Sequence, residues 1–247
     1  MSKKFLVAPV AWLVMLGVLL VTWAVLDPET LIHNFDQSDY SPFELATLPF
    51  YAAIVPFVWW KCPFEGTPRR RAILCLMVSV VAVMAIVKET DLHLWALHKL
   101  YPDFVSEGGS LLPGLYKPNG DALGGTPFKM RVLTNGGVPI GMKLWILAYF
   151  GAFFGTFAAG FAYLFKNWVV GVFKLVPSAW AVGCFGAAGV MVQISDRLPA
   201  WLEHSFSKTS SAQALCTALE EGGEMMIALF ALLAIYLGWR ERMAKKV

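Results

Sequence analysis

Apolar residues dominate six stretches of the chain, and polar or charged residues separate these stretches. An uncharged apolar run of about 18 residues or more is typical of a membrane-spanning helix, because the hydrocarbon layer is about 30 Å thick. The pattern predicts six spans, at residues 5–26, 44–60, 72–87, 144–165, 175–194 and 218–239. Pro49 and Pro56 lie inside the second span, which predicts a short or kinked helix there.

Composition supports the same class of protein. The 247 residues are 57% hydrophobic and 15% charged, with a mean hydropathy of +0.60. Soluble domains are about a quarter charged, so lipid is the expected solvent and membrane lipids are the expected partners. The chain is predicted to be one membrane domain. A net charge of +3 gives no indication of a nucleic-acid partner.

Basic residues are concentrated in the connections on one side of the predicted spans. The side that holds both termini carries 12 lysines and arginines and 2 acidic residues, whereas the other side carries 8 and 15. Connections on the cytoplasmic side of a membrane are rich in lysine and arginine, so both termini are predicted to be cytoplasmic. The predicted fold class is therefore an all-α, six-helix transmembrane bundle with N-in and C-in topology.

Histidines and carboxylates gather on the opposite, outer side. All four histidines are there: His33, His93, His98 and His204. Carboxylates also stand at the ends of three spans, namely Glu44, Glu89, Asp91, Glu220, Glu221 and Glu224. A carboxylate at membrane depth is costly unless it is paired, hydrated or metal-bound, so these side chains are expected to face the bundle interior. The alternative is an ion-pair network or simple exposure at the interface.

Spacing along the helices refines this expectation. If the third span continues as a helix, Glu89 and His93 share a face and Asp91 points elsewhere. His98 is about 140° from His93 on that helix, so the two histidines do not form a metal pair. Glu220, Glu221 and Glu224 form a like-charge cluster that a proton, a lysine or a metal ion must neutralise.

The outer segment 88–143 is the longest connection. Within it, F-K-M-R-V-L-T-N-G-G-V-P-I at 128–140 is typical of a β-hairpin that turns at Asn135-Gly136-Gly137. Loops of this length usually cover or dock something, so this one is positioned to close over the acidic cluster.

Small residues follow one face of the fourth span (Gly151, Gly155, Ala159) and of the fifth (Gly183, Ala187). Such spacing is typical of helices that pack closely in a membrane. It leaves open a non-enzymatic subunit or scaffold of a larger membrane protein complex.

Four short segments resemble a group of uncharacterised bacterial integral membrane proteins. They are K-E-T-D-L-H at 88–93, the F-K and K-L-W segments at 128–129 and 143–145, and L-E-E-G-G-E-M at 219–225. That group carries an (R/K)-E-x-D-x-H motif after an inner span and L-E-E-x-x-E in the last helix, with a further glutamate opening the second helix. The resemblance implies a bacterial inner-membrane location and no particular activity. It also implies that the acids and His93 act together, but it does not account for Gly222-Gly223.

Three functions remain open on the sequence. The first is a metal-dependent enzyme that acts at the outer face on a lipophilic substrate. Its candidate catalytic residues are Glu89, Asp91 and Glu221, and its candidate metal ligands are His93, Glu89, Glu220, Glu224, Glu44 and His204. Mixed oxygen and nitrogen ligands predict Zn, Mn or Fe. The second is the scaffold or subunit, and the third is a proton or cation carrier, which the absence of charge in the middle of the spans disfavours.

Overall fold

The chain folds into a bundle of helices, with residues 3–35, 42–112, 127–128, 130–202 and 210–245 described by the computed structural model. Within these ranges all secondary-structure elements are helices, and the only strand-like pairing is an isolated antiparallel bridge between Val105 and Leu111. The predicted all-α class is confirmed for the described residues.

The elements follow one another in a simple order. They are η1 (Lys3–Leu6), α1 (Val7–Val25), α2 (Pro28–Phe35), α3 (Pro42–Trp60), α4 (Pro68–Glu89), α5 (Leu92–Leu100), α6 (Met130–Thr134), α7 (Ile140–Phe150), η2 (Gly151–Gly155), α8 (Thr156–Phe173), α9 (Pro177–Leu202) and α10 (Ser210–Ala244). η1 is a 3₁₀ turn, and η2 is a π-helical turn that joins α7 to α8.

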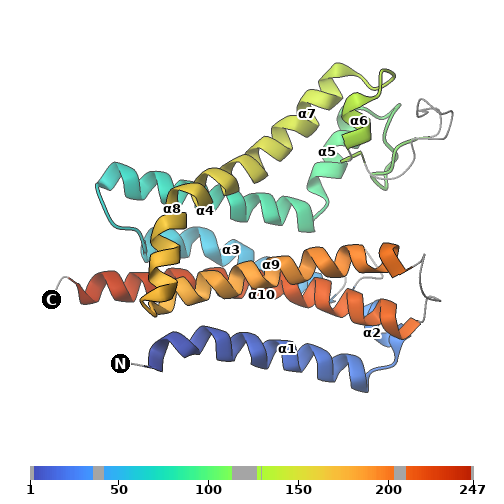
Figure 1. The fold of residues 1–247 in the computed structure, drawn as a ribbon. Coiled ribbons are helices and arrows are strands. Elements are labelled where there is room, and N and C mark those ends of the chain that lie inside the picture. Colours follow the sequence, from blue (N-terminus) through green and yellow to red (C-terminus); the bar gives the residue numbers. More distant parts are fainter. Residues whose placement is uncertain (1–2, 36–41, 113–126, 129, 203–209, 246–247) are drawn as a thin grey trace.

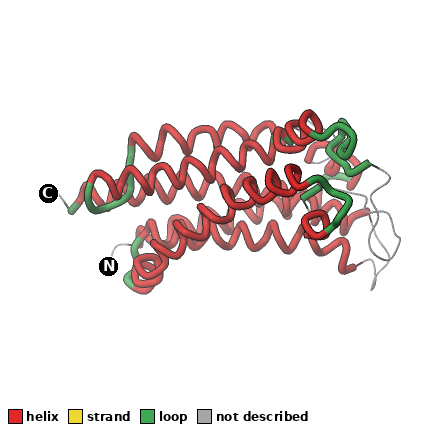
Figure 2. Tube along the Cα trace, turned by 90° about the horizontal axis from the view of Figure 1, so that it is seen from above, coloured by secondary structure: helices red, strands yellow, loops and turns green. Residues whose placement is uncertain are grey.

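α10 is the central element of the bundle. It packs against α9, α3, α2 and α1. Of these, α1 and α3 run beside it in opposite directions (Figure 1). One buried cluster joins α1, α2 and α9 to α10 around Phe230, and a second joins α3 and α4 to α10 around Val58. Both termini lie at the same end of the bundle, whereas α5 and α6 lie at the opposite end (Figures 1 and 2).

Five helical segments are long and apolar enough to cross a membrane. They are Lys3–Val25, Pro68–Glu89, Ile140–Phe173, Pro177–Leu198 and Ser211–Ala244. At the second predicted span, 44–60, the structure has a shorter apolar helix, Leu45–Trp60, with Pro49 and Pro56 inside it. Much of the outer surface is apolar as well, for example at Val14 and Val21 of α1. These features are those of a helical membrane protein whose surface contacts lipid.

The segment from α7 to α8 is largely exposed, with only 6% of its most apolar stretch buried inside the structure. η2 and α8 nevertheless lie beside α4, and α8 also lies beside α9, where the Trp168 side chain donates a hydrogen bond to the Ala179 oxygen at 3.0 Å. A Cβ added at Gly151 or Gly155 would meet nothing within 4 Å, so these two glycines are not needed for close helix contact in the described residues. Phenylalanine rings contact one another along this segment, as Phe157 and Phe161 do at a centroid distance of 6.3 Å.

The predicted hairpin at 128–140 is wrong. Met130–Thr134 forms the short helix α6, and Asn135 to Val138 form the turn that leads into α7. The Asn135 side-chain oxygen accepts a hydrogen bond from the Gly137 N–H at 2.8 Å. Val132 and Val138 are buried in a cluster with Met142 and Ile146. The Asn-Gly-Gly turn therefore connects two helices, because packing of the valines against α7 outweighs the local preference for strands.

Candidate functional site

The acidic residues of α4 and α10 lie at a common depth. At about 1.5 Å per residue, residues 71 to 89 of α4 span about 27 Å, and residues 224 to 240 of α10 span about 24 Å. Arg71 and Arg240 belong to the end of the bundle that holds both termini. In a hydrocarbon layer about 30 Å thick that began at the level of Arg71 and Arg240, Glu89 and Glu224 would lie near the opposite edge.

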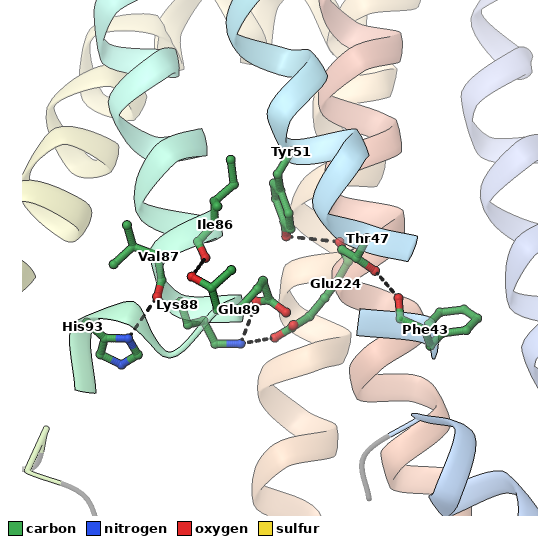
Figure 3. A network of polar contacts seen from close by, with 10 residues as sticks. Phe43, Thr47, Tyr51, Ile86, Val87, Lys88, Glu89, His93 and Glu224 are labelled. Carbon is green, nitrogen blue, oxygen red and sulfur yellow. Dashed lines mark hydrogen bonds and ion pairs between the residues drawn. The ribbon is translucent and has the colours of Figure 1, made fainter. Parts of the chain in front are cut away.

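A lysine bridges these two acids. Lys88 Nζ lies 2.6 Å from Glu224 Oε1 and 3.0 Å from Glu89 Oε1, and so links α4 to α10 (Figure 3). The side chains of Glu89 and Glu224 are 5% and 9% exposed, whereas that of Lys88 is 54% exposed. The carboxylates are thus held inside the bundle, and their ammonium partner reaches them from the surface.

Glu221 completes a group of three carboxylates. One oxygen of each of Glu89, Glu221 and Glu224 lies within 4.8 Å of the others. Residues three apart on a helix share a face, which is why Glu221 and Glu224 both turn toward the end of α4. Carboxylate oxygens this close together can hold a single metal ion.

Comparison with known proteins does not extend this description. No protein-family model matches the chain, and neither a curated protein nor a solved structure gives a significant match.

α3 supports the cluster from a third direction. The Tyr51 hydroxyl donates to the backbone oxygen of Glu224 at 3.2 Å, and the Thr47 hydroxyl donates to the Phe43 oxygen at 3.0 Å (Figure 3). Both side chains are buried. The sequence analysis missed Tyr51 and Thr47, because they are single polar groups inside an apolar run. The two prolines of that run were the available signal, since they mark an irregular helix.

The two glycines between the acids allow other helices to approach. A Cβ added to Gly222 would lie 2.6 Å from Leu19 Cδ1 of α1. A Cβ added to Gly223 would lie 2.6 Å from Val192 Cγ2 and 3.1 Å from Met191 Cε of α9. Gly222 and Gly223 thus hold α1 and α9 against the acid-bearing turn of α10.

We expect Gly222→Ala to lower the free energy of unfolding by about 1–3 kcal/mol, because the added methyl overpacks the contact with Leu19. This loss should exceed the gain of about 0.5–1 kcal/mol from replacing a helical glycine by alanine. Gly17→Ala in α1 is the matched control, since a Cβ there meets nothing within 4 Å. Unfolding in detergent by SDS titration measures both. Equal stability of the two variants would contradict the close contact.

His93 does not join the cluster. α4 ends at Glu89, and Asp91 adopts a left-handed conformation with φ of 49° before α5 begins at Leu92. The expected common face of Glu89 and His93 is therefore wrong, because the helix does not continue between them. Asp91 is exposed in this turn, which suits a residue type that tolerates the left-handed region.

The histidine ring instead belongs to an aromatic corner formed by α5 and α7. His93 Nδ1 lies 3.1 Å from the Val87 oxygen, and the ring stacks on Tyr149 at a centroid distance of 5.0 Å. Phe128 contacts it edge-on at 4.8 Å. Burial lowers the pKa of His93 below its ordinary value, so the ring is neutral at pH 7 and packs as an aromatic group. In Figure 3 it points to Val87, away from Glu224.

The other predicted ligands are placed as follows. Glu220 lies next to the group of three on α10 but is not part of it. The Glu44 side chain and the whole of His204 lie outside the described residues. His98, which was not predicted to be a ligand, lies on α5, and its Nδ1 is 2.7 Å from the oxygen of Val105 in the turn that follows this helix. The structure thus brings together three of the predicted acids and adds Lys88 as their counter-ion.

Proposed function

We propose that the chain crosses a bacterial inner membrane six times, with both termini in the cytoplasm. The position of both termini at one end of the bundle supports an even number of crossings (Figure 1). The apolar helix Leu45–Trp60 supplies the sixth crossing beside the five longer segments. The excess of lysine and arginine on the side of the termini favours the cytoplasmic orientation.

We further propose that Glu89, Glu221 and Glu224 bind one divalent metal ion at the outer face. The observation that carries this proposal is the approach of three carboxylates from two helices to within 4.8 Å at the edge of the hydrocarbon layer. Glu89, Glu221 and Glu224 would hold the ion, and the Lys88 ammonium, which contacts Glu89 and Glu224 in the structure, would have to move outward into water. Its half-exposed side chain makes this movement possible.

The composition of the cluster narrows the choice of ion. With His93 turned away, the ligands in the described residues are all carboxylate oxygens. Oxygen ligands favour a hard ion such as Mn²⁺ over Zn²⁺. Of the three ions expected from the sequence, manganese is therefore the one that this group of acids fits best.

The activity we propose is metal-dependent chemistry on a lipophilic substrate. A bound ion at this depth would polarise a carbonyl or phosphoryl oxygen of a molecule that lies in the outer leaflet. Glu89 and Glu224 hold the site together across α4 and α10 through Lys88, and Glu221 contributes the third carboxylate from α10.

Metal analysis tests the proposal. Purified protein reloaded with Mn²⁺ and desalted should retain about one ion per chain, and Glu221→Gln and Glu224→Gln should each retain under about a tenth of that, since each removes a charged ligand. Glu65→Gln, at the other end of the bundle, is the control and should bind like wild type. Absence of retained metal in wild type, or equal retention in all four proteins, rules the site out.

A further inference from the structure

The end of the bundle that holds both termini contains a second charged feature, separate from the acidic cluster. A cavity of about 290 Å³ lies between the loop after α3, the start of α4 and the end of α10. Its lining consists of Phe64, Glu65, Gly66, Arg71, Arg242 and Lys245. Three cationic side chains thus face one carboxylate across a small space.

The carboxylate is already paired. Glu65 Oε1 lies 2.7 Å from Lys245 Nζ, and both side chains are largely exposed. Arg71 and Arg242 make no ion pair with a carboxylate in the part of the chain that the structure describes. The polar contact of Arg242 is one long hydrogen bond of 3.4 Å from Nη1 to the Phe64 oxygen. Two guanidinium groups therefore line the cavity without a counter-ion from the described residues.

Both guanidinium groups also carry a donor that lacks an acceptor. The Nε atoms of Arg71 and Arg242 are buried from solvent and have no hydrogen-bond partner. Buried donors in folded proteins are nearly always satisfied, and an exception needs an explanation. Trp12 and Trp180 have unpaired buried Nε1 atoms as well, and none of these four atoms is accessible to a ligand. A ligand in the cavity would therefore meet the terminal nitrogens of Arg71 and Arg242, whose positive charge is the feature that favours an anion.

The cavity lies at the level where a membrane meets water. Lys61 Nζ lies 3.8 Å and 4.0 Å from the ring centres of Trp60 and Trp239, at the ends of α3 and α10. Tryptophan is enriched at the headgroup level of membranes. Arg71 and Arg242 each stand within a few residues of this level on α4 and α10.

We propose that this cavity binds a phosphate group, with Arg71 and Arg242 as its two principal ligands. The planar fork of arginine matches the oxygens of a phosphate, and basic pockets between helices on the cytoplasmic side of membranes bind anionic headgroups. The phosphate belongs either to the headgroup of an anionic lipid or to free inorganic phosphate. Neither the site nor its ligand depends on the metal site at the other end of the molecule.

Native mass spectrometry of the full chain in detergent tests the lipid source. With equal amounts of phosphatidylglycerol and phosphatidylcholine, wild type should retain phosphatidylglycerol about five-fold in excess. Arg71→Gln/Arg242→Gln should bring the ratio to near one. Arg240→Gln is the matched control, because Arg240 lies at the same end of α10 but over the Tyr236 ring rather than in the cavity.

Thermal unfolding with inorganic phosphate tests the other source. Stabilisation of wild type by phosphate but not by chloride of equal ionic strength, lost in the double variant and kept in Arg240→Gln, assigns the site to free phosphate. If the double variant does not fold, the single variants Arg71→Gln and Arg242→Gln replace it, and each should lose a large part of the preference. The proposal is overturned if the variants match wild type in both experiments, or if Arg240→Gln abolishes binding equally.

Discussion

Lys88→Met is expected to lower the free energy of unfolding by about 2–3 kcal/mol. Breaking a buried ion pair costs about 3–5 kcal/mol, because it leaves a buried charge without a partner. The loss expected for Lys88→Met is smaller than that, because the Lys88 side chain is half exposed, although Glu89 and Glu224 are almost fully buried. Methionine preserves the length and most of the packing of the lysine stem, so the loss reports the ammonium group. SDS titration in detergent, without divalent ions, measures it.

A double-mutant cycle isolates the pairing from other effects. Lys88→Met/Glu224→Gln should be more stable than the sum of the two single variants predicts, with a coupling of about 1–3 kcal/mol. Lys99→Met is the control, because Lys99 lies on α5 at the same end and its ammonium lies over the Trp95 ring at a distance of 6.0 Å, with no ion pair to a carboxylate of the described residues. Loss of less than about 0.5 kcal/mol in Lys88→Met, similar to Lys99→Met, would show that the bridge contributes little.

The same Lys88→Met variant should bind Mn²⁺ at least about ten-fold more tightly than wild type. In wild type the ion must displace the ammonium from Glu224 and Glu89, and the variant removes both this competition and the repulsion between two cations a few ångströms apart. Saturating Mn²⁺ should also restore the stability lost in the variant, since 100-fold excess over Kd adds about 2.7 kcal/mol. Isothermal titration calorimetry and SDS titration with Mn²⁺ measure the two effects.

This result separates two accounts of the cluster. Unchanged or weaker binding in Lys88→Met, with no recovery of stability by Mn²⁺, would mean that the three acids serve a structural ion-pair network. Glu221→Gln added to Lys88→Met is the control for the metal account and should abolish the gain. These outcomes do not bear on the phosphate cavity at the other end.

The helices could be predicted because hydropathy and length are local properties. The third and sixth predicted spans, 72–87 and 218–239, lie within α4 and α10, which extend further at both ends. The additional turns contain Lys88 and Glu89 at the end of α4 and the residues before the sixth predicted span at the start of α10. Polar side chains lower the hydropathy of these turns, so the hydropathy pattern does not indicate that the helix continues. Alternation of the crossings also predicted that the acids of three spans share a common depth. Glu89, Glu221 and Glu224 of the third and sixth spans do lie together, whereas the side chain of Glu44 in the second span lies outside the described residues.

The details of the cluster could not be predicted in the same way. The break at Asp91 depends on one left-handed residue, which the sequence K-E-T-D does not require. The direction in which the Lys88 side chain points depends on its contact with Glu224 of α10, which is 136 positions further along the chain. The role of Tyr51 depends on the rotation of α3 within the bundle. Each follows from tertiary packing, and a short local pattern contains no signal for it.

The turn at Asp91 has a mechanical consequence. Lys88 and Glu89 on one side of it reach α10, while His93 on the other side is wedged between the Val87 oxygen and the Tyr149 ring of α7. The same short segment therefore contacts α10 through Lys88 and α7 through His93. A displacement of α7 relative to α10 would act on the few residues that also position the Lys88 ammonium.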